Sequence, residues 1–254
     1  MNYNNFSSIE SRMPVLNLIL KNLVEIEVDV TNLFEGSCLP SGTKVNGYNE
    51  HTVLSPKIND DYIFQDDSND VILWFLDNVN KDPLYICGPV CCGKTSCVKQ
   101  ISARLNYPVF EITGHNRLKF PELAGYLSVN DNQMIYQYGP LALAMKYGGL
   151  FLLKDIDVLD QSTATGLNSI LDGSPLCITE NGGELIEPHR MFRFVGTAKT
   201  NGFFDETGLY PGTLRQNIAF MDRFTLCEYS YLYPENEIQL LRKKVPDLPM
   251  DFIQ

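Results

Sequence analysis

The residues with the clearest chemical potential form a glycine-rich segment that a lysine and a threonine follow at once. Residues 88–95 read Gly-Pro-Val-Cys-Cys-Gly-Lys-Thr, which matches the phosphate-binding pattern G-x-x-x-x-G-K-[ST], the Walker A motif. Glycines let the backbone wrap closely around phosphate oxygens, and the N–H groups at a helix N-terminus attract negative charge. Lys94 is suited to reach the β- and γ-phosphates, and the Thr95 hydroxyl is suited to ligate Mg²⁺. The predicted cofactors are ATP and Mg²⁺, and the predicted nucleotide-binding residues are Gly88, Pro89, Val90, Cys91, Cys92, Gly93, Lys94, Thr95 and Ser96.

The phosphate pattern lies in the strand, loop and helix context that its chemistry requires. Residues 84–87 form a short apolar run typical of a buried strand, and residues 94–105 carry apolar side chains at helical spacing. A glycine-rich turn unrelated to phosphate is the alternative, and this context disfavours it. Cys91 and Cys92 fill variable positions of the loop. They are either tolerated small residues or thiols whose pKa the positive loop lowers, which would make them redox-sensitive.

The rest of the chain alternates short apolar runs with helical patterns, which indicates a parallel sheet covered by helices on both faces. A helix is predicted over residues 70–79, and Asp160 is the predicted N-cap of another helix with Ala164 and Leu167 on one side. The predicted fold class is α/β, a three-layer α/β/α sandwich of the P-loop type. Its mainly parallel sheet has five predicted strands, at residues 84–87, 109–112, 150–153, 191–195 and 224–227.

Two hairpin-like insertions interrupt this alternation. One covers residues 127–138, with turn residues at 130–132. The other pairs residues 176–178 with 185–186 across the Asn-Gly-Gly turn at 181–183. Residues that grip a partner would lie in these two insertions, but no sequence rule identifies a partner from them.

Composition and charge narrow the possible function classes. The chain has 254 residues, of which 44% are hydrophobic, and no apolar run reaches the roughly 18 to 20 residues that span a bilayer, so we expect no membrane partner. The N-terminus lacks a basic segment followed by an apolar run, so a cytoplasmic location is expected. A net charge of −11 opposes the counterion release that drives nucleic-acid binding, which disfavours nucleic acid as a partner.

The seven cysteines favour reduced thiols rather than a disulfide framework. Their number is odd, and four of them lie between residues 87 and 97. The three histidines are scattered along the chain, so no metal site is expected from this cysteine cluster.

Several further segments, taken with the phosphate loop, make the chain resemble the MoxR-like branch of AAA+ ATPases, and most closely the CobS-type subunits of aerobic cobaltochelatase. The resemblance extends from about residue 62 to residue 235. The segments that carry it are residues 103–108, 139–141, 148–153, 186–194, 207–213 and 221–224.

This resemblance implies a ring-forming ATPase with a dynein-related AAA domain. Such proteins form homo-oligomeric or hetero-oligomeric rings, usually hexamers, and couple hydrolysis to the remodelling of a partner, commonly one with a von Willebrand A-type domain. The resemblance places an arginine finger at Arg223, with Arg215 as the second candidate. A surface or structural arginine is the alternative at both positions.

The family pattern fails at two positions that matter for hydrolysis. After the third strand the family has Asp-Glu, the Asp holding Mg²⁺ and the Glu orienting water, whereas this chain has Lys154-Asp155. The sensor position after the fourth strand, normally Asn, is Lys199. A lysine at position 154 would repel Mg²⁺ at close range, by several kcal/mol in a partly dry site.

Three consequences of these lysines are open. Asp155, one residue along, could take the metal-side role, which makes it both a predicted catalytic residue with Arg223 and a predicted metal ligand with Thr95. Alternatively, Lys154 and Lys199 could neutralise the phosphates themselves, so that nucleotide is hydrolysed slowly or not at all. Finally, both lysines could point to solvent.

The domain boundaries follow from the same resemblance. Residues 1–60, with an apolar helix-like run at 13–24, are the expected N-terminal extension, and residues 61–228 are the expected AAA+ nucleotide-binding core. Residues 229–254 begin a helical lid that is expected to be mostly missing, because the chain stops soon after the first lid helix.

Two functions follow from these observations. The first is an ATPase that remodels a partner, with Lys94, Thr95, Asp155 and Arg223 as its working residues. The second is a structural subunit that binds nucleotide without hydrolysing it, which Lys154 and Lys199 favour. A DNA-linked motor is disfavoured by the acidic charge.

Overall fold

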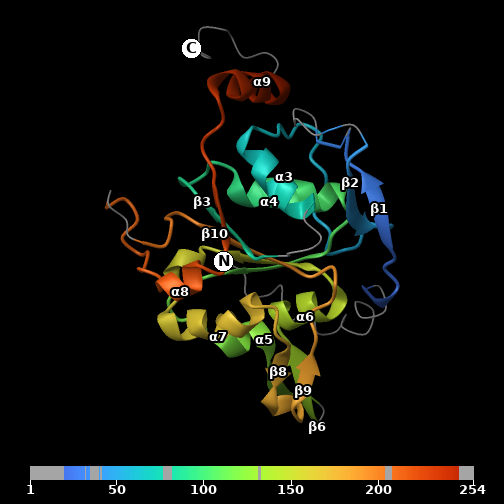
Figure 1. Ribbon diagram of the computed structural model, residues 1–254, viewed down its shortest axis with the longest axis vertical. Coiled ribbons are helices and arrows are strands. Elements are labelled where there is room, and N and C mark those ends of the chain that lie inside the picture. The colour runs from blue at the N-terminus through green and yellow to red at the C-terminus, as the bar shows by residue number, and fades with distance from the viewer. Residues whose placement is uncertain are drawn as a thin grey trace.

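The computed structural model describes residues 20–31, 33–34, 40, 42–76, 82–130, 133–203 and 208–245. Figure 1 shows these residues in three layers, with a central sheet between α3 and α4 on one side and α5, α6, α7 and α8 on the other. Both faces of the sheet carry an apolar core, one around Ile86 and Leu152 and the other around Phe151 and Leu153. The helices are α3 (Asp67–Leu76), α4 (Lys94–Arg104), α5 (Phe120–Ala124), α6 (Pro140–Tyr147), α7 (Gln161–Leu171) and α8 (Ile218–Met221).

The central sheet is parallel throughout, and its strand order is β11-β3-β10-β7-β4. Its middle strands β3, β10 and β7 are short and buried along nearly their whole length, which fits strands covered on both faces. The predicted α/β sandwich with five parallel strands is therefore confirmed. The strands are β3 (Leu84–Cys87), β4 (Val109–Thr113), β7 (Leu150–Lys154), β10 (Arg193–Ala198) and β11 (Thr225–Glu228).

Several predicted elements have bounds that differ from those observed by one to three residues, and β10 and α3 differ most. Strand β10 begins at Arg193 rather than at residue 191, because Phe192 N donates to His189 O (2.8 Å) in a turn that takes up the preceding residues. Helix α3 begins at Asp67, three residues early, where the Ser68 hydroxyl accepts a hydrogen bond from Gln65 N (3.2 Å). The predicted end of this helix, residues 77–79, lies outside the described residues.

Both predicted hairpins are present and lie beside each other. Strand β5 (Gly125–Asn130) pairs with β6 (Gln133–Tyr138), and β8 (Leu176–Ile178) pairs with β9 (Glu184–Ile186) after the short η2 helix (Thr179–Asn181). Turn residues 131–132 lie outside the described residues. In Figure 1 the hairpins project together beyond α5 and α6, on the side away from α3.

A half-buried cluster of charged and polar side chains joins the two hairpins to α6. Glu184 accepts hydrogen bonds from the Tyr138 hydroxyl (2.6 Å) and from Lys146 Nζ (2.8 Å). The amide of Asn181 donates to the same carboxylate. Because the three donors come from different elements, these contacts favour a single relative placement of the two hairpins.

Residues before the predicted core are packed against it. Strands β1 (Glu25–Asp29) and β2 (Lys44–Tyr48) form an antiparallel pair. The N–H of Tyr48 donates to Leu105 O (2.9 Å), and its buried hydroxyl donates to Gly148 O (2.6 Å). Most of the helix-like run at residues 13–24 lies outside the described residues.

Helix α9 (Pro234–Lys244) lies at the position predicted for the first lid helix, and none of its residues is buried. Its last residue, Lys244, forms an ion pair with Asp61 (2.7 Å). In the part of the chain that the structure describes, no helix is long and apolar enough to cross a membrane.

The predicted N-cap of α7 is confirmed and offers a test by pH. Asp160 Oδ1 accepts a hydrogen bond from Thr163 N (2.7 Å), and its other oxygen contacts Lys119 Nζ. The hydrogen bond from Lys119, followed by those from Thr163, lowers the pKa of Asp160 from 3.8 to about 2. This stabilisation is present above pH 4 and is lost as the pH falls through 3.8 toward 2.

We expect Asp160→Ala to lower Tm at pH 7 and to flatten the acid limb of a Tm-against-pH curve, whereas an unchanged curve would contradict the assignment.

Candidate nucleotide site

The phosphate loop connects the end of β3 to the start of α4, as predicted. Its backbone is left-handed at Gly88 (φ 154°), Cys91 (φ 65°) and Gly93 (φ 109°). A Cβ at Gly88 would lie 1.9 Å from the carbonyl oxygen of Tyr229, so no side chain fits at that position. Glycine is therefore required at Gly88 by both the dihedral angle and the close approach of a neighbouring backbone.

Lys94 lies within the curve of this loop. It is 9% exposed, and its Nζ donates to the carbonyl oxygens of Gly88 (2.7 Å) and Pro89 (2.6 Å). The ammonium is thus held at the loop by backbone carbonyls.

Thr95 and Ser96 lie in the first turn of α4, where helix N–H groups favour anions. Pro89 and Val90 complete the loop, with Val90 exposed.

The two loop cysteines have different surroundings. Cys91 is exposed, whereas Cys92 is buried and its thiol donates to Tyr229 O (3.4 Å). Burial raises the pKa of Cys87 and Cys97, which flank the loop, to about 11, so these two thiols are poor nucleophiles near neutral pH. The redox sensitivity suggested for Cys91 and Cys92 stays a prediction.

The two lysines that depart from the family pattern lie at the same sheet edge as the phosphate loop. Lys154 ends β7 and Lys199 follows β10. Strand β10 pairs with β3 and with β7, so that Ala198 is level with Cys87, and Thr197 with Lys154. The carboxyl ends of adjacent parallel strands meet at one edge of a sheet, which is where such folds bind ligands.

Each of these lysines has a carboxylate partner. Lys199 Nζ lies 2.9 Å from Asp155 Oδ1, and Lys154 Nζ lies 3.7 Å from Glu111 Oε2 on β4. Glu111 also pairs with Lys99 of α4 (2.6 Å). The lysine side chains are 29% and 30% exposed, so solvent screens these pairs and each contributes modestly to stability. The predicted catalytic carboxylate, Asp155, is therefore engaged in an ion pair with the Lys199 ammonium.

Asp155 has an unusual backbone conformation. Its φ of 52° lies in the left-handed region, where residues other than Gly are uncommon and Asp and Asn are among those that adopt it most often. It is followed by a short 3₁₀ helix, η1 (Ile156–Val158). The turn sends Asp155 and Asp157 toward different partners.

A carboxylate that the sequence reasoning did not assign lies at the centre of this edge. Asp157 is fully buried, and its Oδ2 accepts hydrogen bonds from Lys199 N (2.9 Å) and Thr200 N (3.0 Å). An acidic residue flanked by Ile156 and Val158 directly after a buried strand was the available signal, since burial of such a charge requires hydrogen-bond partners.

The two candidate arginines lie at different ends of the sheet. Arg223 precedes β11, whose first residue Thr225 is level with Leu84, the first residue of β3. The structure therefore does not bring Arg223 to the phosphate loop of its own chain. Its guanidinium forms two contacts with Asp172, at 2.8 and 3.1 Å.

Arg215 lies on a segment that is tied to the loop end of the sheet. The neighbouring Leu214 N donates to the carbonyl oxygen of Asp157 (2.8 Å). Arg215 itself is exposed, and among the described residues no acidic group lies within ion-pair distance of it.

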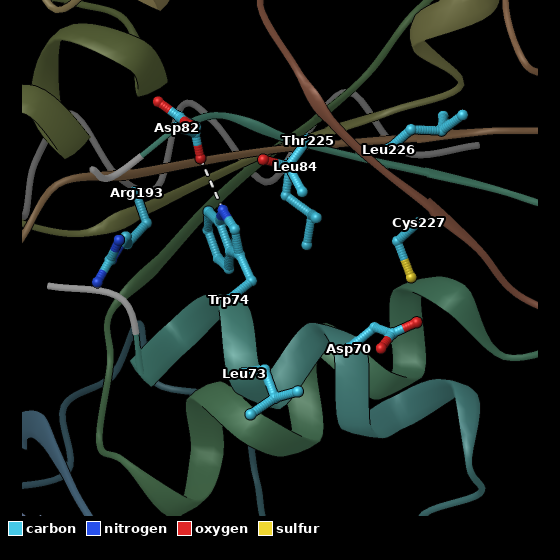
Figure 2. A pocket seen from close by; sticks show the side chains of 9 residues that line it. All are labelled: Asp70, Leu73, Trp74, Asp82, Leu84, Arg193, Thr225, Leu226 and Cys227. Carbon is cyan, nitrogen blue, oxygen red and sulfur yellow. Dashed lines mark hydrogen bonds between the residues drawn. The ribbon is translucent and has the colours of Figure 1, made fainter. Parts of the chain in front are cut away.

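A separate cavity of about 290 Å³ lies at the opposite end of the sheet, between α3 and β11. Figure 2 shows the Trp74 side chain rising from α3 toward Asp82, with the indole N–H donating to Asp82 O (2.6 Å). The guanidinium of Arg193 lies over the Trp74 ring, 5.2 Å from its centroid. Leu84, Arg193 and Thr225 are the first residues of their strands, so this cavity includes none of the predicted nucleotide-binding residues.

Comparison with known proteins agrees with this geometry. The family described as AAA domain, dynein-related subfamily, matches residues 83–216, more than half of the chain. The aerobic cobaltochelatase subunit CobS of Sinorhizobium sp is 25% identical over 244 residues, which cover 94% of this chain and 72% of that protein. The denitrification regulatory protein NirQ of Stutzerimonas stutzeri is 31% identical over 137 residues, 54% of this chain and 50% of that protein.

Other relatives share only this domain. Midasin of Dictyostelium discoideum is 26% identical over 173 residues, so the chain spans 68% of its own length but 3% of midasin. Among solved structures, the crystal structure of a candidate ATPase from Cytophaga hutchinsonii superposes with a TM-score of 0.54 at 16% identity, covering 73% of this chain and 53% of that chain. At this identity the likeness shows the fold alone.

The requirement for glycine at position 88 can be tested by substitution. Gly88→Ala should shift the loop away from Tyr229 O and lower the free energy of unfolding by about 1 to 3 kcal/mol. Gly212→Ala is the matched control, because a Cβ at Gly212 has no neighbour within 4 Å. Denaturant unfolding of both variants measures the difference, and equal midpoints would show that the close approach does not constrain the loop.

Proposed function

This chain belongs to the dynein-related subfamily of AAA domains, and from this premise we propose that it binds ATP and acts as a subunit of an oligomeric assembly that remodels a partner protein. The phosphate loop between β3 and α4 is the observation that carries the proposal. Its glycines adopt the required left-handed backbone, and Lys94 is held within its curve. In this proposal the loop N–H groups and Lys94 bind the phosphates, and Thr95 with Asp155 holds Mg²⁺.

Hydrolysis is proposed to be slow. Lys154 occupies the position where the family has a metal-side carboxylate, and it places positive charge where Mg²⁺ would be held. Asp155, the acid that directly follows Lys154, forms an ion pair with the Lys199 ammonium at 2.9 Å. An acid that is already paired is a weaker metal ligand and a weaker acceptor for the proton of an attacking water.

The same ion pairs favour a second candidate function, a subunit that binds nucleotide without hydrolysing it. Lys154 and Lys199 lie at the loop edge and would supply the positive charge that Mg²⁺ otherwise provides. In this version ATP acts as a ligand that stabilises the assembly, and neither Asp155 nor Arg223 takes part in chemistry.

The arginine that reaches a neighbouring subunit's nucleotide is also part of the proposal. The resemblance favours Arg223, but its guanidinium is engaged by Asp172. Arg215 is exposed on a segment anchored beside the site, so its side chain has the greater freedom to reach across a subunit boundary. Both residues are retained as candidates, with the geometry favouring Arg215.

A partner surface is proposed on the two joined hairpins. Their exposed apolar side chains include Val129 (72% exposed), Met134 (71%) and Leu185 (63%). Apolar side chains gathered on a projection of this kind are typical of a protein-contact surface. The ring, its hexameric state and a partner with a von Willebrand A-type domain rest on the family resemblance.

The proposal predicts separable effects on binding and on turnover. Lys94→Ala should weaken ATP binding at least tenfold, because it removes the ammonium held in the loop. Lys154→Asp should raise Mg²⁺-dependent phosphate release, because it restores a metal-side carboxylate. Titration calorimetry with ATP and a phosphate-release assay, each with and without Mg²⁺, measure the two effects. The exposed Lys57→Met is the control for loss of a lysine.

Four results decide between the candidates. Low wild-type turnover that rises in Lys154→Asp supports a weakened ATPase. Binding without turnover in either protein supports the non-hydrolysing subunit. Rapid Mg²⁺-dependent turnover in the wild type that Lys154→Asp does not improve contradicts slow hydrolysis, and absence of ATP binding contradicts both functions.

A further inference from the structure

The buried carboxylate of Asp157 makes more contacts across the candidate site than any of its neighbouring acids. Its side chain is fully buried directly after β7, and Oδ2 accepts three hydrogen bonds, from Lys199 N, Thr200 N and the Thr200 hydroxyl (3.2 Å). Its other oxygen, Oδ1, has no hydrogen-bond partner among the described residues. A buried charge accepting two backbone N–H groups fixes the peptide units that donate to it.

Lys199 is consequently held at two points. Its backbone N–H donates to the carboxylate of Asp157 (2.9 Å). Its ammonium forms an ion pair with Asp155 (2.9 Å), which precedes Asp157 by two residues. Thr200 O in turn accepts the hydroxyl of Tyr85 (3.1 Å), which lies on β3 two residues before the end of that strand. The turn after β10 is thereby connected to both of its neighbouring strands.

The backbone of Asp157 holds a third segment. Its carbonyl oxygen accepts hydrogen bonds from Leu214 N (2.8 Å) and from the side-chain amide of Gln216 (3.4 Å). Gln216 is 3% exposed, and its backbone N–H donates to Gly202 O (2.8 Å). These contacts enclose the exposed Arg215 between two anchored residues.

We infer that Asp157 is a positioning residue, which fixes the Lys199 turn through its side chain and the Arg215 segment through its backbone. This inference rests on the proposed function, since the position of Lys199 affects activity only if nucleotide binds at this edge. Asp157 does not itself contact the nucleotide, and it acts by fixing the position of Lys199. Loss of its carboxylate would release the Lys199 N–H, and the ammonium would no longer be directed to the edge where phosphate binds.

Asn is the replacement that this geometry tolerates. Its amide oxygen can accept both N–H groups, and its NH₂ group would take the place of Oδ1, which has no partner to repel it. Ala removes the acceptor and leaves two buried N–H groups unpaired, which is costly. A positioning role therefore predicts that Asp157→Asn retains the wild-type behaviour and Asp157→Ala loses it.

The test combines hydrogen exchange of the full-length chain with ATP titration. In Asp157→Ala we expect faster exchange at residues 196–203 and about tenfold weaker ATP binding, whereas residues 210–218 keep their bonds to the Asp157 carbonyl oxygen and should change little. The loss of affinity should disappear when Lys199→Met is the background, because the effect passes through that side chain. Asp160→Ala is the control for general destabilisation, since this acid lies three residues away and contacts neither segment.

Each result bears on the inference. Unchanged exchange in Asp157→Ala, an equal loss in Asp157→Asn, or a loss of affinity that persists in the Lys199→Met background would overturn it. If Asp157→Ala does not fold, Thr200→Val replaces it, with a smaller rise in exchange at residues 196–203 expected and no rise overturning the inference. If the wild type binds no ATP, the proposed function fails, but exchange in the absence of ATP still decides whether the Asp157 carboxylate positions the Lys199 turn.

Discussion

The parallel register of β10 between β3 and β7 is the constraint on which the candidate site depends. With Ala198 level with Cys87 and Thr197 level with Lys154, three strands end together at one edge. The phosphate loop, the Lys154-Asp155 turn and the Lys199 turn are therefore neighbours, although more than a hundred residues separate the first from the last. A shift of one residue in either pairing would reverse which side chains face each core and would move the strand ends out of alignment by about 3.3 Å.

Two sets of contacts beyond the ends of the strands reinforce this arrangement. The close approach of Tyr229 O to Gly88 ties the end of β11 to the phosphate loop, and the Cys92 thiol donates to the same carbonyl. On the other side of the loop edge, Asp157 ties η1 to the Lys199 turn. The loop edge is thus fixed by buried backbone contacts, and Lys94 is buried with them, whereas the side chains of Lys154, Lys199 and Asp155 remain partly exposed.

The distribution of charge at this edge differs from that of an acidic metal site. Lys154 is paired with Glu111 and Lys199 with Asp155, while the Lys94 ammonium is bound by backbone carbonyls. Surface pairs of this kind exchange partners at low cost, because water screens them and their side chains are flexible. An incoming phosphate could therefore draw either lysine away from its carboxylate with little loss in folding stability.

Local chemistry in the sequence determined the phosphate loop, the five strands, the N-cap at Asp160 and both hairpins, because backbone dihedral demands and apolar periodicity depend on adjacent residues. It also placed Lys154 and Lys199 at the ends of strands. Only the tertiary structure decided which carboxylate each lysine contacts and that Arg223 is engaged by Asp172. It alone gave Asp157 its role, since a hydrogen bond to residues 42 and 43 positions away depends on strand pairing that no local pattern encodes.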